Sequence, residues 1–162
     1  MSYFTDVGSR IQRLLTEMIA DGSPENWTDD FIEENNRRLT RAYHTWGSWA
    51  SNFNMNIQQS FVASEEHQEP PMLRWLKPRA GFFVFFYLGD FMVNLTFEEE
   101  RKLWREFIDN GVYLSSGEAF HCSEPGWFRV VYSTETDEVL TKALNRMGKV
   151  LMNTYSRKLT LN

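Results

Sequence analysis

The sequence has few of the residues on which several common kinds of site depend. Its 162 residues include three histidines and a single cysteine, Cys122, so an internal disulfide is excluded and no zinc-binding spacing occurs. It also lacks a glycine-rich phosphate loop and a serine nucleophile elbow. His121 and Cys122 are adjacent, so in an extended segment their side chains point to opposite faces. We therefore expect neither a metal site nor a Cys–His catalytic pair.

Positive charge and long apolar runs are also scarce. Lys and Arg total 17 against 22 Asp and Glu, which gives a net charge of -5, and no basic stripe is interleaved with aromatic residues. This balance argues against nucleic-acid binding, which depends on clustered positive charge. The longest apolar run, residues 81–88, is too short to span a bilayer, and the N-terminus has no signal-peptide pattern. We expect a cytoplasmic protein without a nucleic-acid or membrane partner.

Hydrophobic residues make up 42% of the chain and aromatic residues 15%, which is typical of a folded domain with a substantial core. Apolar residues recur at intervals of three and four along four segments, and this spacing predicts helices. The third of these has a capping box, Thr96 followed by Glu99, and an Asn110-Gly111 stop signal. The first predicted helix covers about 6–20 and the second runs from 26 or 28 to about 53. The third covers 97–109, and the fourth runs from 136 or 137 to about 155.

Strands are predicted in the second half of the chain. Residues 81–88 contain no alternating polar residue and predict a strand that is buried on both faces, while 112–114 and 127–132 predict two further strands. The acidic, proline-bearing segment 54–79 predicts a surface loop or insertion. The expected fold class is α/β, a short sheet covered by helices and preceded by two helices.

Arg129 is the candidate site residue. In the predicted strand, side chains alternate, so Trp127, Arg129 and Val131 share one face. A guanidinium among apolar neighbours is costly unless a carboxylate meets it. An internal ion pair with Glu118 or Glu124 would satisfy it, and so would the carboxylate of a ligand, held by two parallel hydrogen bonds.

The residues around Arg129 also carry a family resemblance. The segment 124–130 is EPGWFRV, and it is preceded by LSSG at 114–117 and FHC at 120–122. This pattern resembles the C-terminal part of the 1-aminocyclopropane-1-carboxylate synthase-like group, which belongs to the fold type I pyridoxal-phosphate aminotransferases of class I/II. The resemblance implies that Arg129 binds the α-carboxylate of an amino-acid substrate, and it favours this role over the ion pair. Ser116 stands where family members commonly have proline.

The resemblance extends to the organisation of the chain. Residues 31–35 (FIEEN), 80–83 (AGFF) and 103–104 (LW) are also similar to family segments, in the same order. It implies that residues 1–25 are the end of a large-domain-like helical segment. Residues 26–162 would then form the aminotransferase-like C-terminal small domain, with a loop insertion near 54–79.

Pyridoxal phosphate is the cofactor that the resemblance implies, held in the family as a Schiff base on a lysine in a Ser-x-Ser-Lys segment. That context is absent around all five lysines, namely Lys77, Lys102, Lys142, Lys149 and Lys158. No catalytic residue is therefore assigned and no cofactor-binding residue is identified. We expect a substrate-carboxylate-binding domain, incomplete and inactive alone, that works with a large cofactor-binding domain in cis or in trans. The alternative is a non-catalytic binding or dimerisation module derived from that fold, which could pair with a second copy as a homodimer.

Overall fold

The structure, a computed structural model, describes residues 13, 16, 27–64, 69–79 and 81–161. The chain divides into two compact units, Met1–Arg37 and Arg38–Asn162. The helix predicted over 6–20 lies, apart from residues 13 and 16, outside the described residues. In the first unit, Arg37 forms ion pairs with Glu33 and Glu34, each at 3.0 Å, as expected for a solvated helical face.

The helix α2 (Trp27–Ser64) is longer than its apolar spacing predicted. The loop predicted over 54–79 is wrong in its first part, because the helix continues past Asn54. This asparagine is buried: its Nδ2 donates to the Leu73 carbonyl (2.8 Å), and its Oδ1 accepts from the Leu73 backbone N–H (2.9 Å). A polar residue therefore occupies a core-facing position of the helix, which interrupted the apolar pattern.

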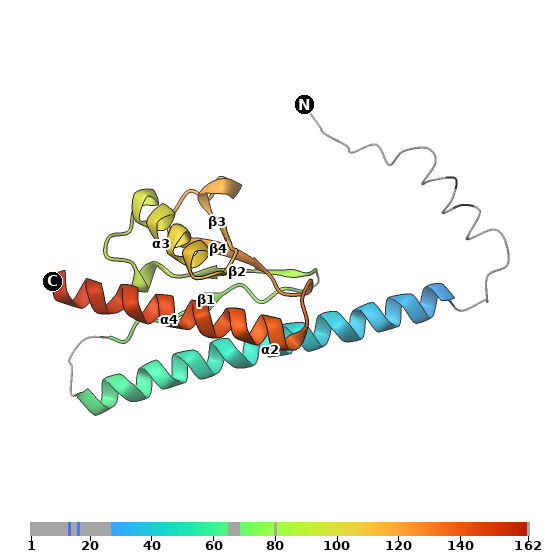
Figure 1. Cartoon of the computed structure of the whole chain (residues 1–162), viewed down its shortest axis with the longest axis horizontal. Coiled ribbons are helices and arrows are strands. Elements are labelled where there is room, and N and C mark those ends of the chain that lie inside the picture. Colours follow the sequence, from blue (N-terminus) through green and yellow to red (C-terminus); the bar gives the residue numbers. More distant parts are fainter. Residues whose placement is uncertain (1–12, 14–15, 17–26, 65–68, 80, 162) are drawn as a thin grey trace. The chain divides into compact units, whose positions relative to one another are not determined.

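Four short strands form one antiparallel sheet, in the order β1-β2-β4-β3 (Figure 1). The strand predicted over 112–114 is displaced, because pairing with the neighbouring strand begins only at Ser115. The Leu114 carbonyl instead accepts a hydrogen bond from the Trp104 indole N–H at 2.8 Å. The bounds are Arg74–Trp75 for β1, Phe83–Tyr87 for β2, Ser115–Ser116 for β3 and Trp127–Val131 for β4.

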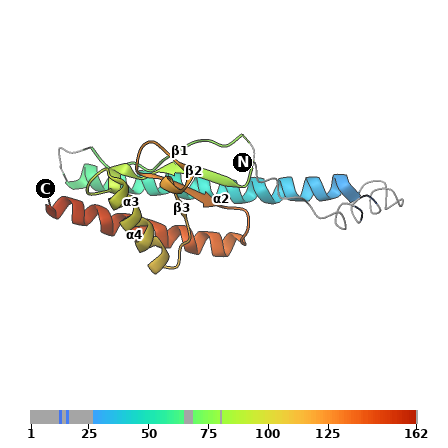
Figure 2. The same cartoon turned by 90° about the horizontal axis from the view of Figure 1, so that it is seen from above.

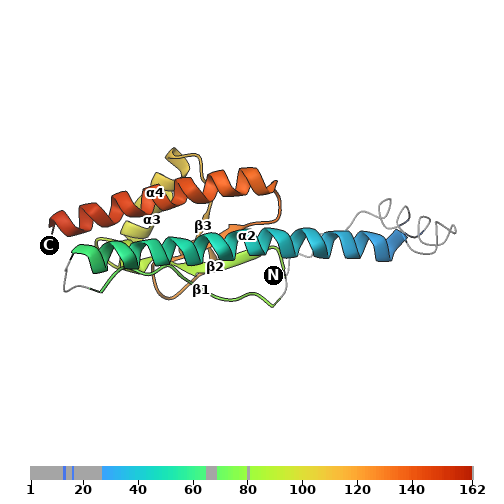
Figure 3. The same ribbon diagram turned by 90° about the horizontal axis from the view of Figure 1, so that it is seen from below.

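Two further α-helices, α3 (Phe97–Asp109) and α4 (Asp137–Leu161), and two short 3₁₀ segments, η1 (Gly89–Phe91) and η2 (Glu118–Phe120), complete the described elements. From residue 38 onward, α2 runs beside α4 in the same direction (Figures 2 and 3). Together with the sheet, these elements confirm the predicted α/β class. In the described part of the chain, none of the helices combines the length and apolarity needed to cross a membrane.

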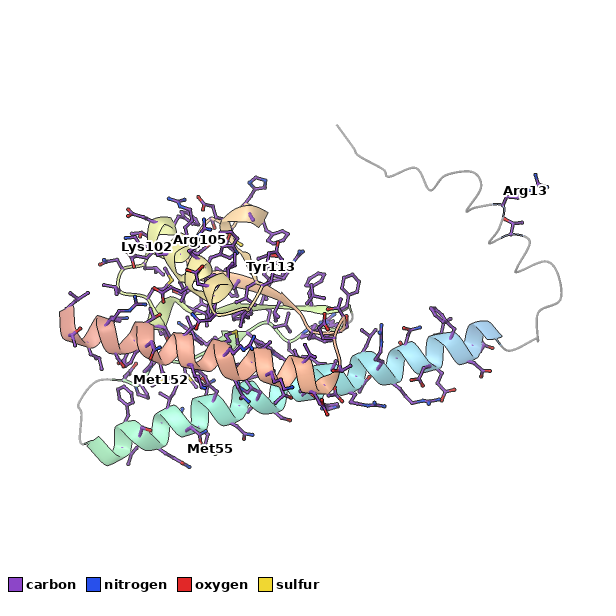
Figure 4. All side chains as sticks on the ribbon, in the orientation of Figure 1. Arg13, Met55, Lys102, Arg105, Tyr113 and Met152 are labelled. Carbon is purple, nitrogen blue, oxygen red and sulfur yellow. The ribbon has the colours of Figure 1, made fainter. Side chains whose placement is uncertain are left out.

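The helices α2 and α4 approach closely at Gly148. A Cβ added there would lie 3.2 Å from the Phe53 ring and 3.4 Å from the Trp49 ring, so glycine lets the two helices pack at short range. Met152 projects from α4 toward α2, whereas Met55 points away into solvent (Figure 4). The contact is therefore built from one side of each helix, as their apolar stripes predicted.

One face of the sheet carries the core. Phe86 of β2 packs against Trp46 of α2, with ring centroids 5.1 Å apart, and against Phe128 of β4 at 6.1 Å. Phe107 of α3 meets the same Phe128 edge-on at 5.8 Å. All four rings are fully buried. The helices α2 and α3 therefore both contact this face of the sheet.

The opposite face of the sheet is only partly covered. Along β2, Val84 and Phe86 are buried, whereas Phe83, Phe85 and Tyr87 are half-buried. The prediction of a strand buried on both faces is therefore wrong. The residues on both sides are aromatic or aliphatic, so the sequence shows no polar alternation even though the two faces differ in exposure. This half-buried face is the one that carries the candidate site.

The N-terminus of α3 confirms half of the predicted capping box. The Thr96 hydroxyl accepts a hydrogen bond from the Glu99 backbone N–H at 3.2 Å, while the Glu99 carboxylate pairs with Lys102. We expect Thr96→Ala to lower the free energy of unfolding by about 1 kcal/mol, because a helix N–H loses its partner. Thr96→Asn, which keeps a capping acceptor, should cost less. Urea denaturation measures both, and equal losses would contradict the capping role.

Candidate functional site

Arg129 lies at the centre of β4. Its Cα is paired with Phe85 of β2 on one side and with Ser115 of β3 on the other. The alternation of burial along β4 confirms that Trp127, Arg129 and Val131 share the face opposite the core. The arginine is half-buried on a surface of half-buried aromatic rings.

Two of these rings enclose the guanidinium. Its Cζ lies 3.9 Å from the ring centroid of Phe120 and 5.1 Å from that of Phe83. Phe120 comes from η2, and its ring also meets Phe85 edge-on at 5.9 Å. An arginine held over aromatic faces keeps its N–H donors in the plane of the guanidinium, where a carboxylate can approach edge-on.

The ion pair that could have satisfied Arg129 is not formed within the described part of the chain. Glu118 instead pairs with Arg101, at 2.6 Å, and Glu124 is exposed and makes no ion pair there. The Arg129 Nε is buried without a hydrogen-bond partner. Leaving a buried donor unpaired costs about 1–3 kcal/mol, and a ligand carboxylate that accepts from this guanidinium would offset that cost.

Glu100 of α3 positions the segment that carries Phe120, and the sequence analysis did not identify this role. The side chain is fully buried, and its two oxygens accept hydrogen bonds from the backbone N–H groups of Glu118 (3.0 Å) and Gly126 (2.6 Å). Burial raises the pKa of the Glu100 carboxyl above its ordinary value, although these hydrogen bonds act in the opposite direction. A signal was present: Glu100 has helical spacing with buried Leu103 and Phe107, so it belongs to the apolar face.

The other residues near the site play local roles. His121 ends η2 in the left-handed conformation, with φ of 59°, and Cys122 is half-buried beside Gly117. Ser116 pairs with Phe128 in the β3–β4 register. Among the described residues, no group of three His, Cys, Asp or Glu side chains is placed to hold a metal ion.

Comparison with known proteins identifies the family. A sequence model described as "Aminotransferase class I and II" matches residues 56–147, more than half of the chain. The chain belongs to the class I and II aminotransferase family. A "1-aminocyclopropane-1-carboxylate synthase-like protein 1" of Mus musculus is 34% identical over 87% of this chain and 24% of its own length. Its namesake in Arabidopsis thaliana is 30% identical over 98% of this chain and 28% of its own length. The resemblance inferred from the residues around Arg129 is thus confirmed.

The chain spans about a quarter of the length of these relatives. Among solved structures, the "Crystal structure of aminotransferase Aro9 from C. Albicans with ligands" matches with a TM-score of 0.43 and 20% identity, over 66% of this chain and 23% of that one.

The residues around Arg129 do not provide a lysine for pyridoxal phosphate. Lys102 pairs with Glu98 and Glu99 on α3, and Lys158 donates to the Asp90 carbonyl at 2.8 Å. None of the five lysines lines either of the two described cavities that border β4.

Proposed function

We propose that this chain is the substrate-carboxylate-binding domain of a pyridoxal-phosphate enzyme that acts on amino acids, either by transamination or in the manner of the synthases. The observation that carries the proposal is Arg129, a guanidinium between two aromatic rings with a buried, unpaired Nε and no carboxylate partner among the described residues. Its in-plane donors match the geometry of a carboxylate. The domain assignment, 26–162 after a segment 1–25, is part of this proposal.

The cofactor and the lysine that binds it would come from a large domain, in cis or in trans. The half-buried aromatic face of the sheet supports such a partner, because Phe83, Phe85 and Trp127 keep part of their apolar surface in water. In the assembled enzyme, which we expect in the cytoplasm, Arg129 would hold the substrate carboxylate and thereby orient the α-carbon toward the cofactor. Alone, the chain should have no transaminase activity.

The mass of the endogenous protein tests this arrangement. An antibody against the region around Arg129 should detect a species more than twice as heavy as 19.2 kDa if a large domain is attached in cis. A species of 19.2 kDa that co-purifies with a lysine-bearing, pyridoxal-phosphate-binding chain would support complementation in trans. A free species of that mass, with no such companion, would contradict both.

A second candidate is a non-catalytic module that binds a carboxylate or forms a homodimer, and the Arg129 guanidinium, which has no ion-pair partner among the described residues, supports its carboxylate-binding form. Calorimetric titration separates the two, because an enzyme domain binds amino acids productively only with its cofactor-bearing partner. If the endogenous protein binds carboxylates through Arg129 and shows no response to pyridoxal phosphate, the module is correct.

Phe120 offers a milder test of the Arg129 site. Phe120→Leu removes the aromatic face beneath the guanidinium, and an exposed cation–π contact is worth about 0.5–1 kcal/mol. We expect binding of a small carboxylate such as acetate to weaken about two- to fivefold, as measured by NMR titration. Phe31→Leu, at an exposed ring on α2, is the control. An equal effect in both variants would argue against a specific contact.

A further inference from the structure

A cavity of about 320 Å³ opens on the same sheet face as Arg129. Phe85, one of its walls, is the direct partner of Arg129 in the β2–β4 register, and Trp127, another wall, precedes Arg129 by two residues on β4. Phe85 also contacts Phe120, which lies under the guanidinium. The cavity therefore begins where the aromatic surroundings of Arg129 end. Its lining residues are Leu76, Phe85, Cys122, Ser123, Glu124 and Trp127.

The walls of this cavity are held in place by the sheet. The Leu76 backbone N–H donates to the Phe85 carbonyl at 2.9 Å, which continues the β1–β2 pairing by one residue. On the other side, the Trp127 ring contacts the Tyr87 ring in a tilted arrangement, with centroids 5.3 Å apart, and Tyr87 lies two residues from Phe85 on the same face. Preformed apolar walls of this kind suit a small organic group, and the volume lies in the range of small-ligand pockets, about 300–1,000 Å³.

The position of the cavity relative to Arg129 limits the ligand. Phe85 contacts both rings that enclose the guanidinium, Phe83 at 5.8 Å and Phe120 at 5.9 Å, so the rest of a molecule whose carboxylate is bound by Arg129 can extend over Phe85 into the cavity. The geometry points to monocarboxylates with an aryl or alkyl side chain as the ligand class of the site. This inference rests on the proposed carboxylate role of Arg129. It adds that the cavity selects the side chain of the ligand.

Glu124 determines what the cavity rejects. Glu124 lines the cavity, is exposed and makes no ion pair within the described part of the chain. A second carboxylate on the ligand would be brought beside this charge and repelled. Dicarboxylates are thus disfavoured, and Glu124 is a specificity-determining residue.

The intact 162-residue chain allows a direct test by NMR titration with acetate, 3-phenylpropanoate and glutarate. We expect 3-phenylpropanoate to bind at least about tenfold more tightly than acetate, which corresponds to about 1.4 kcal/mol, and glutarate no more tightly than acetate. Equal binding of all three, still dependent on Arg129, would overturn the cavity assignment and leave the carboxylate site standing. If no binding depends on Arg129, the proposed function fails as well.

Three variants locate the effect. Leu76→Asn makes one wall polar at nearly constant size and should bring the ratio of the 3-phenylpropanoate and acetate constants toward one. Leu95→Asn, at a leucine that is 53% exposed against 60% for Leu76 and does not line the cavity, should keep the ratio of the wild type. Glu124→Gln should improve glutarate binding severalfold. If both leucine variants keep the wild-type ratio and Glu124→Gln leaves glutarate unchanged, the cavity does not select the ligand.

Discussion

Arg129→Ala should weaken the binding of a small carboxylate by about ten- to a hundredfold. A hydrogen bond between charged groups contributes about 1.5–3 kcal/mol, and the guanidinium is the charged group that the structure places between Phe83 and Phe120. Arg129→Lys should restore only part of the affinity, because an ammonium keeps the charge but loses the planar pair of donors. NMR or calorimetric titration with acetate and with an amino acid measures these constants.

Arg105→Ala is the matched control for this experiment. Arg105 also lies over an aromatic ring, that of Trp104 at 5.4 Å, but on the exposed side of α3 (Figure 4). Its removal should leave carboxylate affinity unchanged while deleting an equal charge. In the assembled enzyme, Arg129→Ala should both raise KM for the amino acid and lower kcat. Carboxylate affinity that is equal in wild type and Arg129→Ala would remove the basis of the proposed function.

The strand that carries Arg129 could be predicted because its two faces differ in chemistry. Alternation placed Trp127 and Arg129 on one side and Phe128 on the other, and the structure has this arrangement. The same alternation of polar and apolar residues is missing from β2, because its more exposed face carries phenylalanine where a solvated strand would carry polar residues. Apolar composition therefore predicted that β2 is a strand, but could not tell which of its faces meets the helices.

Long-range polar contacts explain what else the sequence did not predict. Asn54 can face the core because its side-chain amide is hydrogen-bonded to the backbone of Leu73, which is distant in sequence. The sequence alone does not show this contact, so the polar residue is interpreted there as the end of the apolar stripe of α2. Glu100 is similar: its partners are backbone N–H groups 18 and 26 residues away. A helical face with one polar residue is ambiguous from sequence alone, since the tertiary partner decides whether that residue is buried.

Glu100→Ala should lower the free energy of unfolding by about 2–4 kcal/mol. The backbone N–H groups of Glu118 and Gly126 would lose their acceptor, and each buried unpaired donor costs about 1–3 kcal/mol. Glu100→Gln keeps the shape and one acceptor, so it should cost less. Urea denaturation measures both. Glu98→Gln, at an exposed position on the same helix turn, should change stability little.

The same variants should affect carboxylate binding. Glu100 holds both ends of the segment 118–126, which includes Phe120, over the sheet face that bears Arg129. If the segment loosens, Phe120 no longer confines the guanidinium, and acetate affinity should fall in Glu100→Gln even under conditions where that variant is fully folded. Unchanged affinity in a folded Glu100→Gln chain would limit Glu100 to a purely structural role.

The pH dependence of stability identifies the charge state of Glu100. Its pKa is raised in the folded chain, so the folded state binds the proton more tightly than the unfolded state. The stability that this group contributes is therefore present below its ordinary pKa of 4.5 and is lost as the pH rises through the higher, folded value. The difference in unfolding free energy between wild type and Glu100→Gln should accordingly fall over that interval and then level off. If the difference in unfolding free energy instead grows with pH, the ionised carboxylate is stabilised more than burial destabilises it. The groups that would stabilise it are the N–H groups of Glu118 and Gly126, with the nearby Arg101–Glu118 pair.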